Sequence, residues 1–339
     1  MTKTESLRQD IFRSILRGDY APGGFLPPER DMAAQTGTSR ITVRRAYAAL
    51  EAAGILVRRQ GSGTTVATHL QAATEPMREA ALVTSVIEPF ELAFLRALEA
   101  ELSLRGILLV IRMTGEAPDR EEQAAIDLVS HGVRNLIVWS GGTAFPRETF
   151  HRLRVLGVNT VFFDRVLPGD VADFVGLDNA AAMRDLFGHA VKRQPREAVF
   201  VTHEGLSADS NREREESLRA LCTEANIPCT LHRVPFTGDR KAAFGRLRAF
   251  LTPDRADTAV FCVNDHLAVQ ARAILGADAA IYGVDGLPAA REAGIVTVEQ
   301  PLPDMASALV ECLINQSEAG SAWQARVRRF AGNLITPES

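Results

Sequence analysis

Arginine side chains gather near the start of the sequence in a pattern that suits contact with a nucleic acid. Arg40, Arg44 and Arg45 lie close together, and a second arginine pair precedes the segment QGSG. A guanidinium can donate two parallel hydrogen bonds to guanine or to a phosphate. A glycine-rich tip can approach DNA closely because no side chain stands in the way. This chemistry predicts recognition of double-stranded DNA, against the alternative of a small helical domain with a solvated basic face.

Two helices and a β-hairpin are expected to hold these arginines. A Pro-Pro pair after Leu26 can open a helix, because proline is tolerated where the N–H has no partner. Gly37 can supply the left-handed residue that ends this helix. Thr38 or Ser39 then caps a second helix, whose first turns carry the arginines. Short apolar runs on both sides of the QGSG tip predict the hairpin.

Residues 26–66 resemble the winged helix-turn-helix of the GntR family of bacterial repressors. The resemblance is carried by the segments LPPER, TSRITVRRA and RRQGSGT. It implies a recognition helix in the major groove and a wing beside it, with a helix over residues 6–16 as the scaffold. The predicted DNA contacts are Arg30, Ser39, Arg40, Thr42, Arg44, Gln60 and Gly61.

The remainder of the chain alternates apolar runs of strand length with helical segments, which predicts a parallel, doubly wound sheet. The expected strands are at 81–87, 107–113, 135–140, 160–164, 198–202, 229–234, 259–263, 279–285 and 295–300. Because so many strands are unusual for one open sheet, two Rossmann-like lobes are the more plausible arrangement. Polar residues follow many of these runs. Each could be a helix cap, but ligands of such folds bind beyond the carboxyl ends of strands, so together they favour a polar ligand.

Residues 80–320 resemble the effector domain of the LacI/GalR family, which is related to periplasmic sugar-binding proteins. The segments VGLDNAAAMRDLFGHAV, FCVNDHLAVQARAIL, IYGVDG and VTVEQPLPDMASALVECL carry this resemblance. The sequence departs from the family in two places. Ser217 stands where a glycine is usual, and the C-terminal ITPES lacks the usual arginine motif.

This second resemblance implies a sugar-type effector in an interlobe cleft. The expected effector contacts are Phe90, Trp139, Asp164, Arg165, Arg214, Asn264, Asp285 and Gln300. Arg214 offers a planar donor fork, with Arg212 as its rival, and Asp285 can accept from two hydroxyls. Trp139 either stacks on a sugar ring or belongs to the core. Gln300 either touches the ligand or braces the hinge.

Length and charge support a division into a basic head and an acidic body. The chain of 339 residues is long enough for two or three domains. Residues 1–68 carry a formal charge of +4 and the remainder −8, within a net charge of −4. We expect a DNA-binding domain at 1–68, a linker at 69–79 and an effector-binding and dimerisation domain at 80–339.

Membrane and metal functions find no support in the sequence. No apolar run approaches the length of a membrane span, and the first residues lack the order of a signal peptide, so a cytoplasmic, nucleoid-associated protein is expected. The four cysteines show no CxxC spacing, which favours reduced thiols over a zinc site. We expect no metal.

Enzymatic function is also disfavoured, and no cofactor is expected. GntR-type heads occur on aminotransferase-like bodies, which need a lysine for pyridoxal phosphate. The chain has only Lys3, Lys192 and Lys241, and both body lysines fall in surface-like helical segments. Walker A, GxGxxG, GxSxG and HExxH motifs are absent from the sequence.

The sequence therefore predicts a multidomain protein: an α+β winged helix-turn-helix joined to an α/β two-lobed, periplasmic-binding-protein-like domain. It is similar overall to the arabinose-repressor type of regulator. The predicted function is a repressor of carbohydrate uptake or catabolism genes, a homodimer on a pseudo-palindromic operator, controlled by a sugar. The alternatives are a sensor of a non-sugar such as a purine or nucleoside, a regulator that acts with a corepressor, and a plain small-molecule-binding protein.

Overall fold

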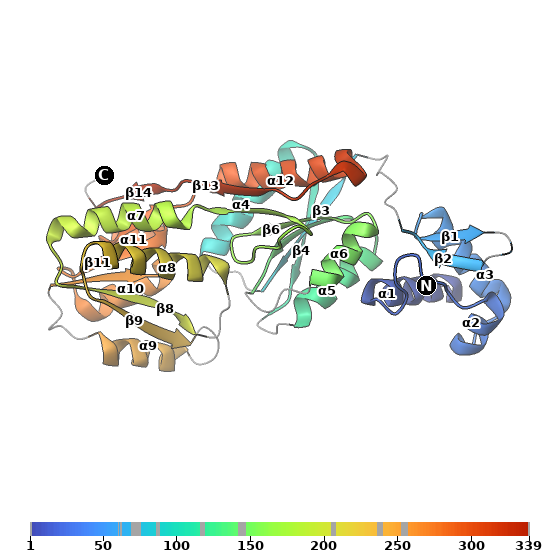
Figure 1. The fold of residues 1–339 in the computed structure, drawn as a ribbon, viewed down its shortest axis with the longest axis horizontal. Coiled ribbons are helices and arrows are strands. Elements are labelled where there is room, and N and C mark those ends of the chain that lie inside the picture. The colour runs from blue at the N-terminus through green and yellow to red at the C-terminus, as the bar shows by residue number, and fades with distance from the viewer. Residues whose placement is uncertain are drawn as a thin grey trace.

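Three bodies follow one another along the long axis of the molecule: a small head and two α/β lobes (Figure 1). The computed structural model describes residues 2–59, 61, 63–68, 76–85, 89–115, 119–141, 147–204, 208–235, 240–251 and 257–337. Within these ranges no helix is both long enough and apolar enough to span a membrane.

The head consists of three helices and a hairpin: α1 (Lys3–Arg17), α2 (Glu29–Thr36), α3 (Arg40–Ala52), β1 (Leu56–Arg59) and β2 (Gly63–Val66). Leu7, Ile11 and Ile15 recur at helical spacing along α1 and are buried, as the sequence predicted. Ser39 is the residue that caps α3, because its side chain accepts from the backbone N–H of Thr42. The tight turn before α3 is thereby fixed, and the first turn of α3 is presented at the surface.

The first lobe is a six-stranded parallel sheet with the order β13-β7-β6-β5-β3-β4. Its strands are β3 (Glu79–Thr84), β4 (Leu108–Met113), β5 (Asn135–Trp139), β6 (Asn159–Phe163), β7 (Asp173–Leu177) and β13 (Val327–Phe330). Its helices are α4 (Pro89–Leu104), α5 (Asp119–Ser130), α6 (Arg147–Val155) and α12 (Leu302–Ala319), followed by the short η2 (Gly320–Ala322). Strands β5, β6 and β7 are buried along their whole length, as expected for a sheet covered on both faces.

The second lobe is also six-stranded, with the order β14-β12-β11-β10-β8-β9, and only its edge strand β14 runs antiparallel among the described strands. Its strands are β8 (Glu197–Glu204), β9 (Cys229–Pro235), β10 (Thr258–Cys262), β11 (Ala280–Asp285), β12 (Val296–Glu299) and β14 (Asn333–Ile335). Its helices are α7 (Asn179–Ala190), η1 (Val191–Arg193), α8 (Asp209–Glu224), α9 (Arg240–Phe250), α10 (Asp265–Leu275) and α11 (Pro288–Glu292).

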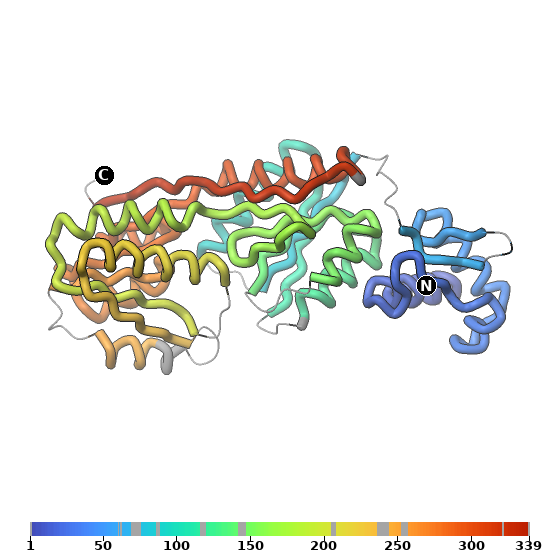
Figure 2. The backbone as a smooth tube through the Cα atoms, viewed as in Figure 1, coloured from blue at the N-terminus to red at the C-terminus, as the bar shows by residue number. Residues whose placement is uncertain are grey.

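The chain crosses between the lobes three times: from β7 to α7, from β12 to α12, and from β13 to β14. The final segment therefore runs along both lobes, as the red end of the tube shows in Figure 2. Each lobe is built from parts that lie far apart in the sequence. The prediction of two lobes is confirmed, and each predicted strand corresponds to a strand of the structure.

Candidate functional site

The exposed surface of the head presents the predicted DNA contacts at the start of α3. Ser39 Oγ accepts from Thr42 N at 3.1 Å and lies 2.9 Å from Thr42 Oγ1. Arg40 is exposed and forms no ion pair with any described residue. Arg30 is 83% exposed beside Asp31. The structure brings these four predicted residues to the outer surface of the head.

Glu29 links the recognition helix to the hairpin. Its carboxylate accepts from Arg44 Nε at 3.1 Å and from Arg58 Nη2 at 3.2 Å. Arg44 stays 60% exposed, so its free guanidinium nitrogens can still reach DNA. Sequence reasoning did not include Arg58 among the DNA contacts, although its place in the RRQGSGT segment was a usable signal. The shared carboxylate therefore fixes the two guanidinium groups relative to each other.

Gly61 lies at the tip of the hairpin, and Gln60 falls outside the described residues. The backbone of Gly61 has a φ of 78°, in the left-handed region that favours glycine. A Cβ at this position would meet nothing within 4 Å. The glycine is therefore required by the turn conformation, and the space around it is open for an approaching duplex.

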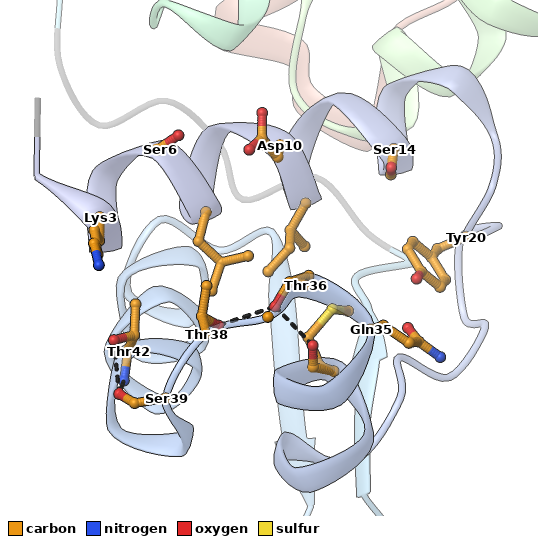
Figure 3. Close-up of a pocket in the computed structure, with 14 residues that line it drawn as sticks. Lys3, Ser6, Asp10, Ser14, Tyr20, Gln35, Thr36, Thr38, Ser39 and Thr42 are labelled. Atoms are coloured by element: carbon orange, nitrogen blue, oxygen red, sulfur yellow. Dashed lines mark hydrogen bonds between the residues drawn. The ribbon is translucent and has the colours of Figure 1, made fainter.

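A hollow of about 740 Å³ lies in the head between α1, α2 and α3 (Figure 3). On the α1 side the hollow is lined by Lys3, Ser6, Asp10 and Ser14. The turn around Thr38, between α2 and α3, lines the opposite side. Ser39 and Thr42 sit at one end of this hollow, so it borders the predicted DNA surface. It is far in the fold from the polar residues that follow the strands of the two lobes.

Those strand-end residues converge between the lobes. On the first lobe, Asp164 and Arg165 follow β6. Arg165 Nη2 donates to Glu91 Oε1 at 2.8 Å, and its guanidinium carbon lies 5.3 Å from the centroid of the Trp139 ring. Asp164 is buried and has a φ of 62°, a conformation that costs a non-glycine residue free energy. Strained backbone of this kind is characteristic of functional sites.

Trp139 belongs to an aromatic cluster at the end of β5. Its ring is 1% exposed and makes edge-to-face contacts with Phe90, Phe94 and Phe163 at centroid distances of 5.7, 4.9 and 4.9 Å. With Arg165 also against it, the indole has no open face on which a sugar ring could stack. Of the two roles considered for Trp139, the structure favours the core role, and Phe90 forms part of the same apolar wall.

Arg214, from α8 of the second lobe, is the buried arginine of this site. Its Nε donates to Asn179 Oδ1 at 2.7 Å, and its Nη1 donates to the carbonyl of Val263 at 2.6 Å. Its Nη2 lies 3.9 Å from Asp164 Oδ1 on the other lobe. The rival Arg212 is instead 58% exposed and pairs with Asp209 on its own helix. Arg214 is therefore the arginine placed between the lobes.

Asp285 and Gln300 meet at the ends of β11 and β12. Gln300 Nε2 donates to Asp285 Oδ1 at 3.0 Å. Burial raises the pKa of the Asp285 carboxyl well above its usual range, and the Arg214 guanidinium opposes this shift. The backbone of Asp285 also has a positive φ, of 126°. A largely buried, hydrogen-bonded carboxyl on strained backbone is suited to a ligand hydroxyl.

Asn264 has a structural task that limits its predicted role. Its Oδ1 accepts from Leu267 N at 3.0 Å and caps α10, so the amide nitrogen and one lone pair of Oδ1 are left for an effector. The adjacent Asp265 is fully buried and accepts from Thr297 Oγ1 and Leu287 N, each at 2.7 Å. Burial raises the pKa of Asp265 to about 7. This carboxyl anchors α10 to the loop after β11.

Four buried polar atoms near these strand ends have no hydrogen-bond partner among the described residues: Ser85 Oγ, Trp139 Nε1, Asp164 Oδ1 and Gln300 Oε1. A buried polar atom without a partner costs about 1–3 kcal/mol, so such atoms are rare in folded proteins. They include both donors and acceptors. A small molecule with several hydroxyl groups would satisfy them.

Several residues of this region were not predicted. Asp209 bridges the lobes, because its N–H donates to the Arg165 carbonyl at 2.6 Å and its Oδ2 accepts from Leu167 N at 2.7 Å. Glu91 and Asn179 hold the two arginines in place. Asn179 lies within the segment VGLDNAAAMRDLFGHAV, which was a usable signal, whereas Glu91 and Asp209 look like ordinary first-turn helix acids.

The head matches a known family. Residues 3–66 match the family model of the bacterial regulatory proteins of the gntR family. Over 157 residues the chain is 32% identical to an uncharacterised HTH-type transcriptional regulator of Mycobacterium tuberculosis, a match that covers 45% of this chain and 64% of that protein. Thus the chain matches less than two thirds of this relative's length.

A second relative is matched almost from end to end. The arabinose metabolism transcriptional repressor of Halalkalibacterium halodurans is 24% identical over 353 residues, covering 95% of this chain and 92% of that protein. The head is therefore a GntR-type helix-turn-helix domain, and the chain has homologues of the arabinose-repressor type.

Solved structures share the fold of the body. A solute-binding protein of an ABC transporter from Bacillus halodurans, with bound myo-inositol, superposes with a TM-score of 0.67 at 18% identity, over 78% of this chain and 96% of that one. The transcriptional regulator CelR in complex with cellobiose gives a TM-score of 0.65 at 20% identity, over 92% of this chain and 99% of that one. The body has the two-lobed fold of periplasmic binding proteins and LacI-type regulators.

Proposed function

We propose that this chain is a sequence-specific transcriptional repressor whose release from DNA is controlled by a sugar or sugar derivative bound between the lobes. The GntR-type head supports the DNA-binding half of the proposal. The relative matched over 92% of its length is an arabinose metabolism repressor, which supports a role in carbohydrate uptake or catabolism. The proposal includes no catalytic step and no cofactor.

The observation that carries the sensor half is the set of buried strand-end atoms that have no hydrogen bond to a described residue. Three of them, on Trp139, Asp164 and Gln300, come from residues predicted as effector contacts. They lie beside two charged groups, Arg214 and Asp285, that suit hydroxyl recognition. A ligand that satisfies these groups and bridges the lobes would stabilise one lobe arrangement over another, as control of DNA binding requires.

The proposed domain division places the head at residues 1–68, the linker at 69–79 and the sensor at 80–339. Within the head we assign DNA contact to the predicted set: Arg30, Ser39, Arg40, Thr42, Arg44, Gln60 and Gly61. Within the sensor we assign effector contact to Phe90, Asp164, Arg165, Arg214, Asn264, Asp285 and Gln300, with Trp139 as a wall residue that offers its Nε1. A repressor of this kind would act in the cytoplasm at the nucleoid.

A thermal-shift screen tests the sensor assignment. The full-length protein is heated with pentoses, hexoses, their phosphates, nucleosides and purines. A ligand at 100 times its Kd should stabilise the folded protein by about 2.7 kcal/mol. We expect the pronounced shift among the sugars. Stabilisation by purines or nucleosides alone would remove the sugar assignment and support the alternative of a non-sugar sensor.

The free edge of the first lobe supports a homodimer. Strand β4 lies at one edge of the sheet and exposes Leu108, Ile111 and Met113, with Leu104 from the end of α4 nearby in sequence. An apolar edge strand open to water invites pairing with another chain. A second copy of this chain is the proposed occupant, because two heads are needed to read a pseudo-palindromic operator.

The substitution Met113→Asp should convert this dimer to a monomer of 36.8 kDa, because it places a charge in an apolar interface. Light scattering coupled to size exclusion measures the mass. The matched control is Val327→Asp, which puts the same charge on β13, the opposite edge of the same sheet, at a residue that is 56% exposed. A dimer retained by Met113→Asp but lost by Val327→Asp would place the interface on the other edge.

A further inference from the structure

The head packs against the outer surface of the first lobe through helix α1. Figures 1 and 2 show α1 alongside α5 and α6, whereas α3 and the hairpin lie on the side of the head away from the lobe. Phe12 of α1 belongs to the same buried apolar cluster as Val129 of α5 and Leu153 of α6, so the core of the head is continuous with that of the lobe. The DNA surface therefore stays open while α1 is held.

Arg152 of α6 makes the polar part of this contact. Its Nε donates to the carbonyl of Leu16 and its Nη2 to the carbonyl of Arg17, both at 3.3 Å. These are among the last carbonyls of α1, which have no partner inside the helix and carry the negative end of its dipole. Gly18 makes the approach possible, since a Cβ there would lie 3.1 Å from Arg152 Cζ.

A second contact lies further along α1. Arg13 Nε is 4.0 Å from Asp127 Oδ1 on α5, and Arg112 reaches the other oxygen of the same carboxylate at 3.8 Å. The Arg134 guanidinium lies 5.7 Å from the centroid of the Phe12 ring. Polar and apolar contacts thus fix one orientation of α1 on the lobe.

Helix α5 connects this surface to the site between the lobes through two adjacent carboxylates. Glu122 accepts from Thr149 Oγ1, which in turn accepts from Arg152 Nη2 at 2.7 Å. Its neighbour Glu121 accepts from Ser140 Oγ at 2.8 Å and from the backbone N–H of Gly141, at the end of β5. Neighbouring residues on a helix point about 100° apart, so one helix contacts both places.

We propose that the outer surface of α5 and α6 is a docking surface for the DNA-binding head, and that α5 couples head docking to the occupancy of the interlobe site. The docking half stands by itself, whereas the regulatory meaning of the coupling rests on the proposed function. A ligand that binds at the end of β5 would change the contacts of Glu121 with Ser140 and Gly141. Because Glu121 and Glu122 are neighbours on α5, the helix would transmit this change to Thr149 and Arg152. In a dimer, two docked heads would lie at a fixed distance from each other, whereas two undocked heads would not.

Hydrogen exchange of the full-length protein tests the docking half without sugar or DNA. Arg152→Gln should speed exchange of the amides at the end of α1, residues 14–19, by about tenfold or more, because the last turn loses its external donors. The control is Arg147→Gln, on the same helix, whose side chain pairs with Asp170 and not with the head. Equal protection in wild type and Arg152→Gln would overturn docking.

The coupling half predicts effects at a distance in both directions, since energetic coupling is reciprocal. Arg152→Gln should speed exchange of the Gly141 amide, and Glu121→Gln should speed exchange at residues 14–19. Thr149→Val should resemble Arg152→Gln, and the double variant should add little to it. Effects confined to the neighbourhood of each substitution, or fully additive effects, would overturn the coupling. A failed sugar screen would leave both exchange results standing.

Discussion

Arg40→Ala is expected to abolish operator preference while ligand binding by the sensor survives. Arg40 is the first residue of α3, is exposed, and forms no ion pair within the described part of the chain, so its guanidinium is free to pair with guanine. An arginine–guanine pair contributes about 1–3 kcal/mol of discrimination, which corresponds to roughly 5- to 160-fold in affinity.

Fluorescence anisotropy on a selected operator and on a scrambled duplex measures the effect. Arg45→Ala is the matched control, because it removes the same charge from the same helix at a residue outside the predicted contacts. It should weaken binding to both duplexes about equally, because it removes a positive charge that attracts the phosphates of any duplex. If Arg40→Ala binds the operator with unchanged preference, the recognition-helix assignment is wrong.

Arg214→Met should destabilise the body by about 3–5 kcal/mol near neutral pH, because it leaves buried carboxyls without their cation. Arg214 touches Asn179 and the Val263 carbonyl and lies near Asp164 across the lobes. The exposed Arg212→Met is the control on the same helix and should cost less than about 1 kcal/mol.

The cost of Arg214→Met should grow as the pH rises from 5 to 8. Burial already raises the pKa of Asp285, and Arg214 lowers it, so losing Arg214 raises this pKa further. A carboxyl whose pKa is raised on folding favours the folded state at low pH, and this stability is lost as the pH rises through the folded-state pKa. Urea unfolding at both pH values measures the difference.

A second variant keeps this test decisive if Arg214→Met alone does not fold. Adding Asp285→Asn removes the buried charge that Arg214 opposes, so the double variant should recover stability towards urea. It should not recover the thermal shift that the stabilising compound of the screen gives with the wild-type protein. Recovery of both would show that Arg214 only balances charge. A pH-independent cost would contradict the role assigned to Asp285.

The sequence predicted the strands and their polar ends because buried parallel strands read as continuous apolar runs. The pattern of apolar runs by itself did not predict β7, β13 and β14 as strands. Strand β13 has the sequence VRRF and β14 only three residues, so neither has an apolar run of strand length. These strands form by pairing with neighbours that are distant in sequence, which periodicity does not register.

Sequence reasoning predicted which candidate residues lie at the boundary between the lobes. It was less successful in predicting the contacts that each of them makes. Asn264 serves mainly as a helix cap, and Trp139 lies in an aromatic cluster. Residues that cap helices and residues that bind ligands are of the same types and occur at the same strand ends. Residue type and position therefore do not distinguish the two roles. The docking of α1 on α5 and α6 was beyond sequence reasoning, because the Arg152 contacts span more than 130 positions along the chain.

The three crossings between the lobes have a genetic consequence. A stop codon after β12 would remove α12 and β13 from the first lobe and β14 from the second, so a late truncation damages both lobes at once. The head would keep all of its described helices and strands, because these come from residues 3–66. Such an allele would leave the DNA-binding head without its effector-binding lobes. Screens for constitutive mutants should therefore find that late stop codons are as disruptive as early mutations in the two lobes.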